Sequence, residues 1–108
     1  MALGHEKLDV YCLAISYVAW VFEHSEKLNG VHRHARDQWL RASQSIPLNI
    51  AEGNVKTAEA DRRRVFEIAR GSVLECAAVQ DVLVVGEVLE ENKSRERKVE
   101  LEISFPIS

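Results

Sequence analysis

The sequence predicts an all-α protein, an up-down antiparallel four-helix bundle with an irregular or short C-terminal segment. Three observations predict this fold. The chain has 108 residues, a length typical of one domain, so we expect a single bundle domain over residues 1–108. Only two prolines and five glycines interrupt it, which favours long helices. Apolar residues recur at steps of three and four through three long segments, the period of helices that bury one face.

Residues 6–28 form the first expected helix, and Asn29-Gly30 should end it because both residues tolerate a left-handed backbone. Apolar residues also lie off the expected core face, and such a surplus indicates an interface. A homo-oligomer is therefore expected. The expected core face holds Leu8, Tyr11, Cys12, Ile15, Val18, Ala19 and Phe22, and the surplus is Leu13, Tyr17, Trp20 and Val21.

Residues 34–52 form the second expected helix, although Pro47 lies inside it. This proline removes a backbone N–H and collides with the carbonyl of residue 43. The segment is either one kinked helix or a helix that restarts with Ser45 as its N-cap. The apolar phase continues across Pro47, which favours one kinked helix, with the hydroxyls of Ser43 and Ser45 bonding freed backbone groups. The core face holds Trp39, Ser43, Ile46, Ile50 and Gly53, and Gly53-Asn54 resembles a helix stop.

Polar residues surround Pro47 on this helix. As a functional site they would contact nucleic acid. As structural residues they would bond the kinked backbone, the turn at Gly53 or a neighbouring helix. We favour the structural interpretation. The cluster comprises Ser45, Pro47, Asn49, Glu52 and Arg70.

Residues 57–86 form the third expected helix, with Thr57 as its cap and Gly86 at its end. Its core face holds Val65, Ile68, Ala69, Ser72, Cys76, Val79 and Leu83.

Residues 88–98 begin a fourth, highly charged helical pattern, but the pattern then changes. From residue 99 onward apolar residues alternate strictly with other residues, which is the period of a strand. We therefore expect residues 99–108 to be short, frayed or extended. The alternating residues are Val99, Leu101, Ile103, Phe105 and Ile107, and Pro106 also disfavours a helix there.

Three segments carry a resemblance to a known family: LDVYCLAISYV at 8–18, LRASQSIPLNIAEGN at 40–54 and FEIARGSVLECAAVQDVL at 66–83. Over about residues 5–90 the chain resembles the four-helix-bundle proteins encoded in intervening sequences of 23S rRNA genes. That family includes accessory variability proteins of diversity-generating retroelements, which assist a reverse transcriptase. The resemblance implies a ring-like homo-pentamer and a protein partner such as a reverse transcriptase. Most members have no established biochemical activity, and the tail KVELEISFPIS departs from the family's regular last helix.

No motif indicates catalysis, so we expect a non-enzymatic protein without a cofactor or metal. The chain has no P-loop, GxGxxG or GxSxG motif. A carboxylate-bridged metal site in a bundle needs Glu-x-x-His pairs, and none occurs around Glu52, Glu67 or Glu75. Cys12 and Cys76 form no CxxC pair and are expected to be buried, reduced thiols.

The N-terminal residues include no apolar segment typical of a signal peptide, and no apolar run is long enough to cross a bilayer. We therefore expect a cytoplasmic protein without a membrane partner.

The charge distribution provides the functional hypothesis. The net charge is −3, but residues 31–72 carry seven Arg and one Lys against five acidic residues. Three consecutive arginines lie near a helix N-terminus, where positive charge opposes the helix dipole. If the basic side chains converge, they form a patch that binds RNA or DNA phosphates. The alternative is a structural or protein-interaction scaffold that binds no nucleic acid. The candidate residues are Arg33, Arg36, Arg41, Lys56, Arg62, Arg63 and Arg64.

Overall fold

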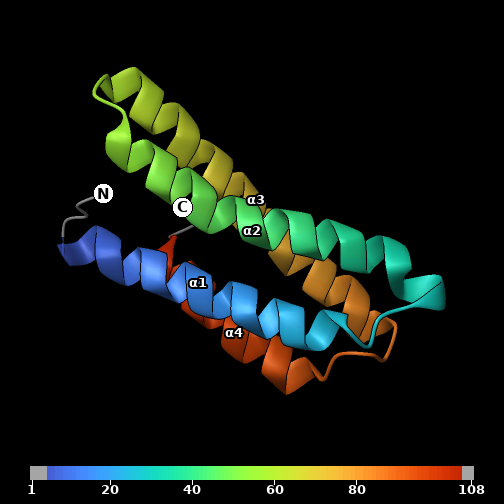
Figure 1. Ribbon diagram of the computed structural model, residues 1–108. Helices are drawn as coiled ribbons and strands as arrows, with labels where there is room; N and C mark the ends of the chain where they lie inside the picture. The colour runs from blue at the N-terminus through green and yellow to red at the C-terminus, as the bar shows by residue number, and fades with distance from the viewer. Residues whose placement is uncertain (1–4, 106–108) are drawn as a thin grey trace.

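The computed structural model describes residues 5–105, with side chains described for residues 9–102 and 105. Within this range the chain forms four α-helices and one short 3-10 helix and no strand. Consecutive helices run antiparallel, which confirms the expected all-α bundle (Figure 1). The elements are α1 (His5–Ser25), η1 (Gly30–His32), α2 (Arg33–Val55), α3 (Glu59–Val85) and α4 (Glu91–Ser104).

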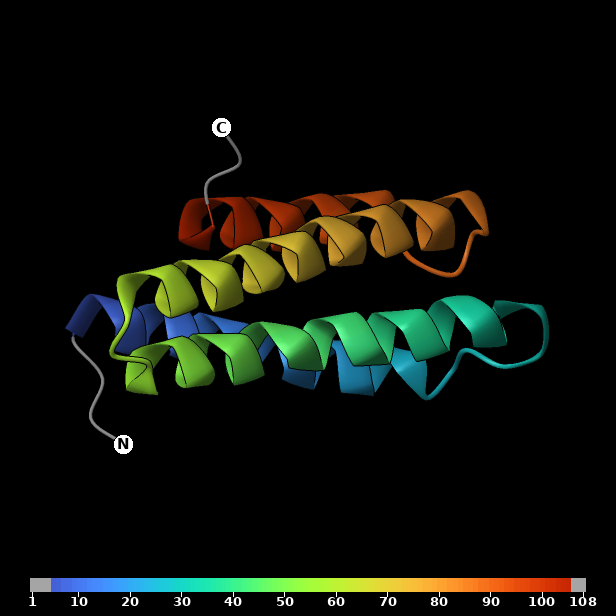
Figure 2. The ribbon, with the colours of Figure 1, turned by 90° about the horizontal axis from the view of Figure 1, so that it is seen from above.

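Helix α2 packs against both α1 and α3, and the α2–α3 hairpin extends beyond α4 at one end (Figures 1 and 2). The side chains between these three helices form the main core. On α2 the core residues Trp39, Ala42, Ile46 and Ile50 are all buried. The predicted core face of this helix is confirmed because Ser43 and Gly53 are buried too.

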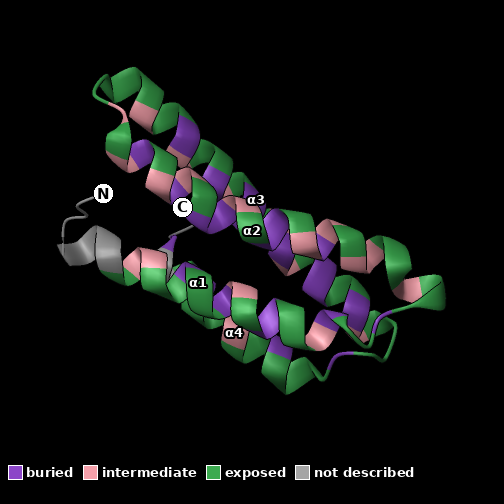
Figure 3. Ribbon diagram, viewed as in Figure 1, coloured by how far each residue is buried: buried purple, intermediate pink, exposed green. Residues whose placement is uncertain are grey.

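The core face predicted for α1 is wrong. Its buried apolar residues are Ala14, Tyr17, Trp20 and Val21, which include three of the residues interpreted as surplus. On the face predicted to be buried, Cys12, Ile15, Ala19 and Phe22 are exposed, whereas Tyr11 and Val18 are half-buried. The side chain of Leu8 lies outside the described residues. Apolar residues lie on most sides of α1, so its periodicity did not determine which face packs inward. Buried and exposed residues alternate along the described part of this helix (Figure 3).

Helix α2 is a single helix that continues through Pro47, as predicted, but Gly53 does not end it. A Cβ atom on Gly53 would lie 2.7 Å from Cε1 of Phe66 on α3. Glycine therefore fits the close approach of the two helices, and a side chain here would force the ring of Phe66 to move. The helix continues two residues further, to Val55.

The start of α3 differs from that predicted, whereas Gly86 is its C-cap, as predicted. The N-cap residue is Ala58, and no side chain caps the helix, so Thr57 is not the cap. At the other end Gly86 has φ −76°, and the left-handed residue is Glu87, with φ 61°. The N–H of Glu87 donates to the carbonyl of Val84 and that of Val88 to the carbonyl of Leu83, which is the Schellman pattern that ends helices.

The strand-like tail is also corrected, because α4 continues through Ser104. Leu101 and Phe105 are four residues apart, so both lie on one helical face and are buried, whereas Val99 is exposed. The N–H of Phe105 donates to the carbonyl of Leu101 at 2.8 Å. Packing of this face against the bundle outweighs the alternating pattern. Residues 106–108 lie outside the described residues.

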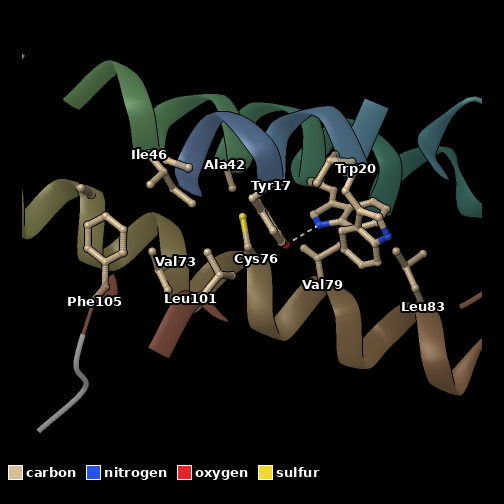
Figure 4. Close-up of a cluster of buried hydrophobic side chains, with 14 of the residues drawn as sticks. Tyr17, Trp20, Ala42, Ile46, Val73, Cys76, Val79, Leu83, Leu101 and Phe105 are labelled. Carbon is tan, nitrogen blue, oxygen red and sulfur yellow. Dashed lines mark hydrogen bonds between the residues drawn. The ribbon is translucent and has the colours of Figure 1, made fainter. Parts of the chain in front are cut away.

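A buried chain of hydrogen bonds links one side chain from each of the four helices. One of its bonds, at the Tyr17 hydroxyl, is the dashed line in Figure 4. Trp39 Nε1 donates to the hydroxyl of Tyr17 at 3.0 Å, and that hydroxyl donates to Gln80 Oε1 at 2.5 Å. Gln80 Nε2 donates to the carbonyl and the hydroxyl of Ser94, both at 3.0 Å. Directional bonds of this kind fix the positions of the four helices relative to one another along the bundle axis.

Burial changes the acid–base properties of two groups near this chain. Burial, and to a smaller extent Cys76, raises the pKa of the Tyr17 hydroxyl above its ordinary value. Burial also raises the pKa of the Cys76 thiol to about 12. Both groups are therefore neutral at physiological pH. Cys76 is buried as predicted, whereas Cys12 is exposed, and both are free thiols.

Candidate nucleic-acid interface

The α2–α3 hairpin ends in a charged tip, which we define as residues 52–64. It carries four of the seven candidate cations, Lys56 and Arg62, Arg63 and Arg64. The three consecutive arginines are about 100° apart around α3, so they point in different directions. Arg63 and Arg64 are exposed, and Arg62 is half-buried. The tip extends away from α1 and α4 (Figure 1), which leaves it accessible to a large partner.

Two of these cations already have carboxylate partners on the same helix. Lys56 pairs with Glu52 at 3.6 Å and Arg63 with Glu59 at 3.3 Å, both at i,i+4 spacing. Exposed pairs of this kind contribute little free energy. Both cations can therefore exchange their partner for a phosphate at small cost.

Arg62 and Arg64 form no ion pair with any described residue. The Nε atom of Arg62 is buried without a hydrogen-bond partner in the described part of the chain. A buried donor without a partner carries a free-energy penalty. These two arginines are the strongest cationic features of the tip.

The structure does not bring the other candidate cations to the tip. Arg33 and Arg36 lie at the start of α2, which is about 33 Å from its end at about 1.5 Å per residue. Arg36 donates to the carbonyl of Leu28 at 3.1 Å and pairs with Asp37 at 3.1 Å. Arg41 lies between the two ends and pairs with Glu75 at 3.0 Å. The seven candidates therefore form no single patch, because α2 separates them along its length.

The polar cluster around Pro47 is only partly as predicted. Asn49 Nδ2 donates to the carbonyl and the hydroxyl of Ser45, at 2.8 and 2.9 Å. The hydroxyl of Ser72 on α3 donates to that of Ser45 at 2.9 Å. The hydroxyl of Ser43 donates to the carbonyl of Leu40. It therefore does not bond the backbone carbonyl that lacks a partner because Pro47 has no N–H. The cluster thus joins α2 to α3.

Glu52 and Arg70 do not take part in that cluster. Glu52 pairs with Lys56, and Arg70 pairs with Glu67 at 3.1 Å within α3. The expected contact between Arg70 and the polar cluster is therefore wrong.

The sequence did not show that two apolar faces of the bundle are exposed. The α1 outer face lies opposite the core side of α1. A second stripe, at the same three- and four-residue steps, lies along the later part of α3 and could have been found from that spacing. The α1 outer face comprises Cys12, Ile15, Ala19 and Phe22, and the α3 outer face comprises Gly71, Leu74, Ala78, Val82 and Val85, all exposed.

Other kinds of site find little support in the described part of the chain. Between residues 5 and 105, no group of three or more His, Cys, Asp or Glu side chains is placed to hold a metal ion. No helix in this range is long and apolar enough to cross a membrane. One hollow between described residues of α1 and α4 is lined by Trp20, His24 and Lys93.

Fold and surface together define an all-α four-helix bundle with a charged hairpin tip and two exposed apolar faces. The chain matches the family model of the 23S rRNA-intervening sequence protein over residues 6–104. This match covers most of the chain, so the protein belongs to the 23S rRNA-intervening sequence protein family.

A solved structure has the same fold. It is the crystal structure of a protein with unknown function from the S23 ribosomal protein family of Bacteroides thetaiotaomicron. The two chains are 17% identical and superpose with a TM-score of 0.81, over 92% of this chain and 90% of the other. Identity at this level establishes the shared fold alone. A search among curated proteins finds no match.

Proposed function

We propose that this protein is a non-enzymatic module that assembles with copies of itself and binds the phosphate backbone of RNA or DNA through the hairpin tip. The observation that carries the phosphate-binding part is the pair Arg62 and Arg64, which have no carboxylate partner in the described chain. Arginine binds phosphate through two parallel N–H donors. Contacts of this kind position a nucleic acid without reading its bases.

The two outer faces support self-assembly. Phe22 on α1 remains 49% exposed and Val85 on α3 remains 84% exposed. The two faces lie on diagonally opposed helices and differ in their residues, so copies would join head to tail. Such a contact closes into a ring when its rotation allows, and the family resemblance implies five copies. A ring carries one tip for each copy, so several weak phosphate contacts together bind one nucleic acid more tightly than a single tip does.

A salt series tests the phosphate-binding part. We expect fluorescence anisotropy with a labelled structured RNA and a labelled duplex DNA to show binding that weakens as salt increases. The double variant Arg62→Ala and Arg64→Ala should reduce the slope of log affinity against log salt by about two for duplex DNA, near one unit per lost contact. The control variant Lys93→Ala and Arg95→Ala removes two exposed charges from α4 and should leave the slope unchanged. Equal effects of both variants would remove the tip from the proposal.

Light scattering tests the assembly. We expect the protein to elute with five times the 12.2 kDa mass of one chain. Phe22→Asp on the α1 outer face or Val82→Asp on the α3 outer face should each yield monomers. Mixing the two variants should form a dimer and nothing larger, because one intact contact remains. Leu48→Asp, on the exposed side of α2, is the control and should assemble normally.

The second candidate is a protein-interaction scaffold that binds no nucleic acid, with an acidic partner or a reverse transcriptase at its basic surface. The existing ion pairs of Arg41, Lys56 and Arg63 favour it, because neutralised charges attract polyanions weakly. Failure to bind RNA or DNA at low salt would support this candidate.

A further inference from the structure

Helix α4 differs from the other three helices in what it presents to the core. Bundle helices bury an apolar residue about every three or four positions. The first half of α4 buries Ser94 instead, with Arg97 and Lys98 half-buried beside it. Among the side chains described from residue 91 onward, the buried apolar ones are Leu101, near the end of α4, and Phe105, directly after it.

Polar contacts hold this first half. Gln80 donates to the carbonyl and the hydroxyl of Ser94. The guanidinium of Arg97 lies 5.2 Å from the ring centre of Trp20, and Lys98 pairs with Asp81 on α3. Water can replace each of these contacts, so their net contribution to docking is small.

The other three helices have a core that does not depend on α4. Helix α2 lies between α1 and α3 and buries Trp39, Ala42, Ile46 and Ile50. The α2–α3 hairpin also packs beyond the end of α4, where Gly53 approaches Val65 and Phe66. Removal of α4 therefore leaves most of the apolar packing in place.

The connection into α4 holds an unfavourable backbone conformation. Glu87 has φ 61° at the Schellman position that glycine usually occupies. A residue with a Cβ atom is disfavoured in this left-handed region. Release of the segment between α3 and α4 would allow Glu87 to return to an ordinary conformation.

We propose that α4 is a releasable strap, which detaches as a unit about Glu87 while α1, α2 and α3 stay packed. In the closed state α4 covers Trp20 and Gln80, which are buried. In the open state both become accessible on the side of the bundle between α1 and α3. The strap is thus a conformational device that controls access to this surface, and it does not depend on phosphate binding or assembly.

Hydrogen exchange with mass spectrometry on the full chain tests the strap. We expect α4 amides to exchange faster than those in the centre of α2. Lys98→Ala removes the contact with Asp81 and should accelerate α4 exchange about two- to fivefold. The control Arg95→Ala removes a charge whose partner, Glu91, lies within α4, and it should have no such effect. Equal effects of the two variants would overturn the proposal.

A second variant separates local release from global unfolding. Val65→Ala destabilises packing beyond the end of α4, so exchange in the centre of α2 should rise about tenfold. Exchange in α4 should stay unchanged, because the open state keeps Val65 packed. Equal changes in the two helices would show that α4 is released only by global unfolding and would overturn the proposal.

Discussion

The two helical glycines Gly53 and Gly71 should respond to alanine in opposite directions. Alanine within a helix is favoured over glycine by about 1 kcal/mol. A Cβ on Gly71 would meet no atom within 4 Å, so Gly71→Ala should raise the free energy of unfolding by about 0.5–1 kcal/mol. A Cβ on Gly53 would lie 2.7 and 2.8 Å from two ring atoms of Phe66 and 3.1 Å from Val65. Overpacking of this kind costs about 1–3 kcal/mol.

After the helix-propensity gain is subtracted, Gly53→Ala should lower the free energy of unfolding by about 0–2 kcal/mol. The ring of Phe66 is half-buried, so it can shift outward, which places the expected loss in the lower part of that range. Urea denaturation of both variants measures the difference. Gly71 lies on the α3 outer face, so its substitution can also affect assembly. The urea midpoint should therefore be measured at several protein concentrations, because a midpoint that stays constant reports packing within one chain.

A double variant tests the cause. Phe66→Leu removes the ring atoms nearest to Gly53, so Gly53→Ala should cost less in that background than in the native chain. A stabilising effect of Gly53→Ala similar to that of Gly71→Ala would refute the close approach between α2 and α3.

Two further predictions concern the buried polar groups. Gln80→Met leaves the Tyr17 hydroxyl without its acceptor and should cost about 1–3 kcal/mol in urea denaturation. Combination with Tyr17→Phe should cost less than the sum of the two changes, and strict additivity would contradict the hydrogen-bond chain. The raised pKa of Cys76 means that the unfolded thiol loses its proton at lower pH than the folded thiol. Stability should therefore fall as pH rises from about 9 towards 12, and Cys76→Ala should make that fall shallower.

The sequence predicts the helices well where their apolar stripes are narrow. On α2 the stripe from Trp39 to Gly53 is clear, and every member is buried. On α1 apolar residues lie all round the helix, so the phase is ambiguous, and the packing of Tyr17 and Trp20 against α2 decides it. For α4, Leu101 and Phe105 fit both a period of two and a helical step of four, and only the bundle that they pack against distinguishes the two.

The candidate site was harder to predict than the fold. Clustering in sequence placed Arg33 and Arg64 in one basic segment, but the length of the hairpin separates them in space. Gln80 and Ser94 had no signal in the sequence, because a buried polar residue looks like an exposed one until its partners are known. Gly53 resembled a helix stop, and only the position of Phe66 explains it.

The hydrogen-bond chain through Tyr17, Trp39, Gln80 and Ser94 has an evolutionary consequence. Each member would leave a neighbour's donor or acceptor unpaired if it changed alone. Relatives of this protein should therefore either keep the chain or replace several of its members together, for example with phenylalanine at position 17 and an apolar residue at position 80. Coordinated replacement would leave a trace of covariation at four positions far apart in sequence.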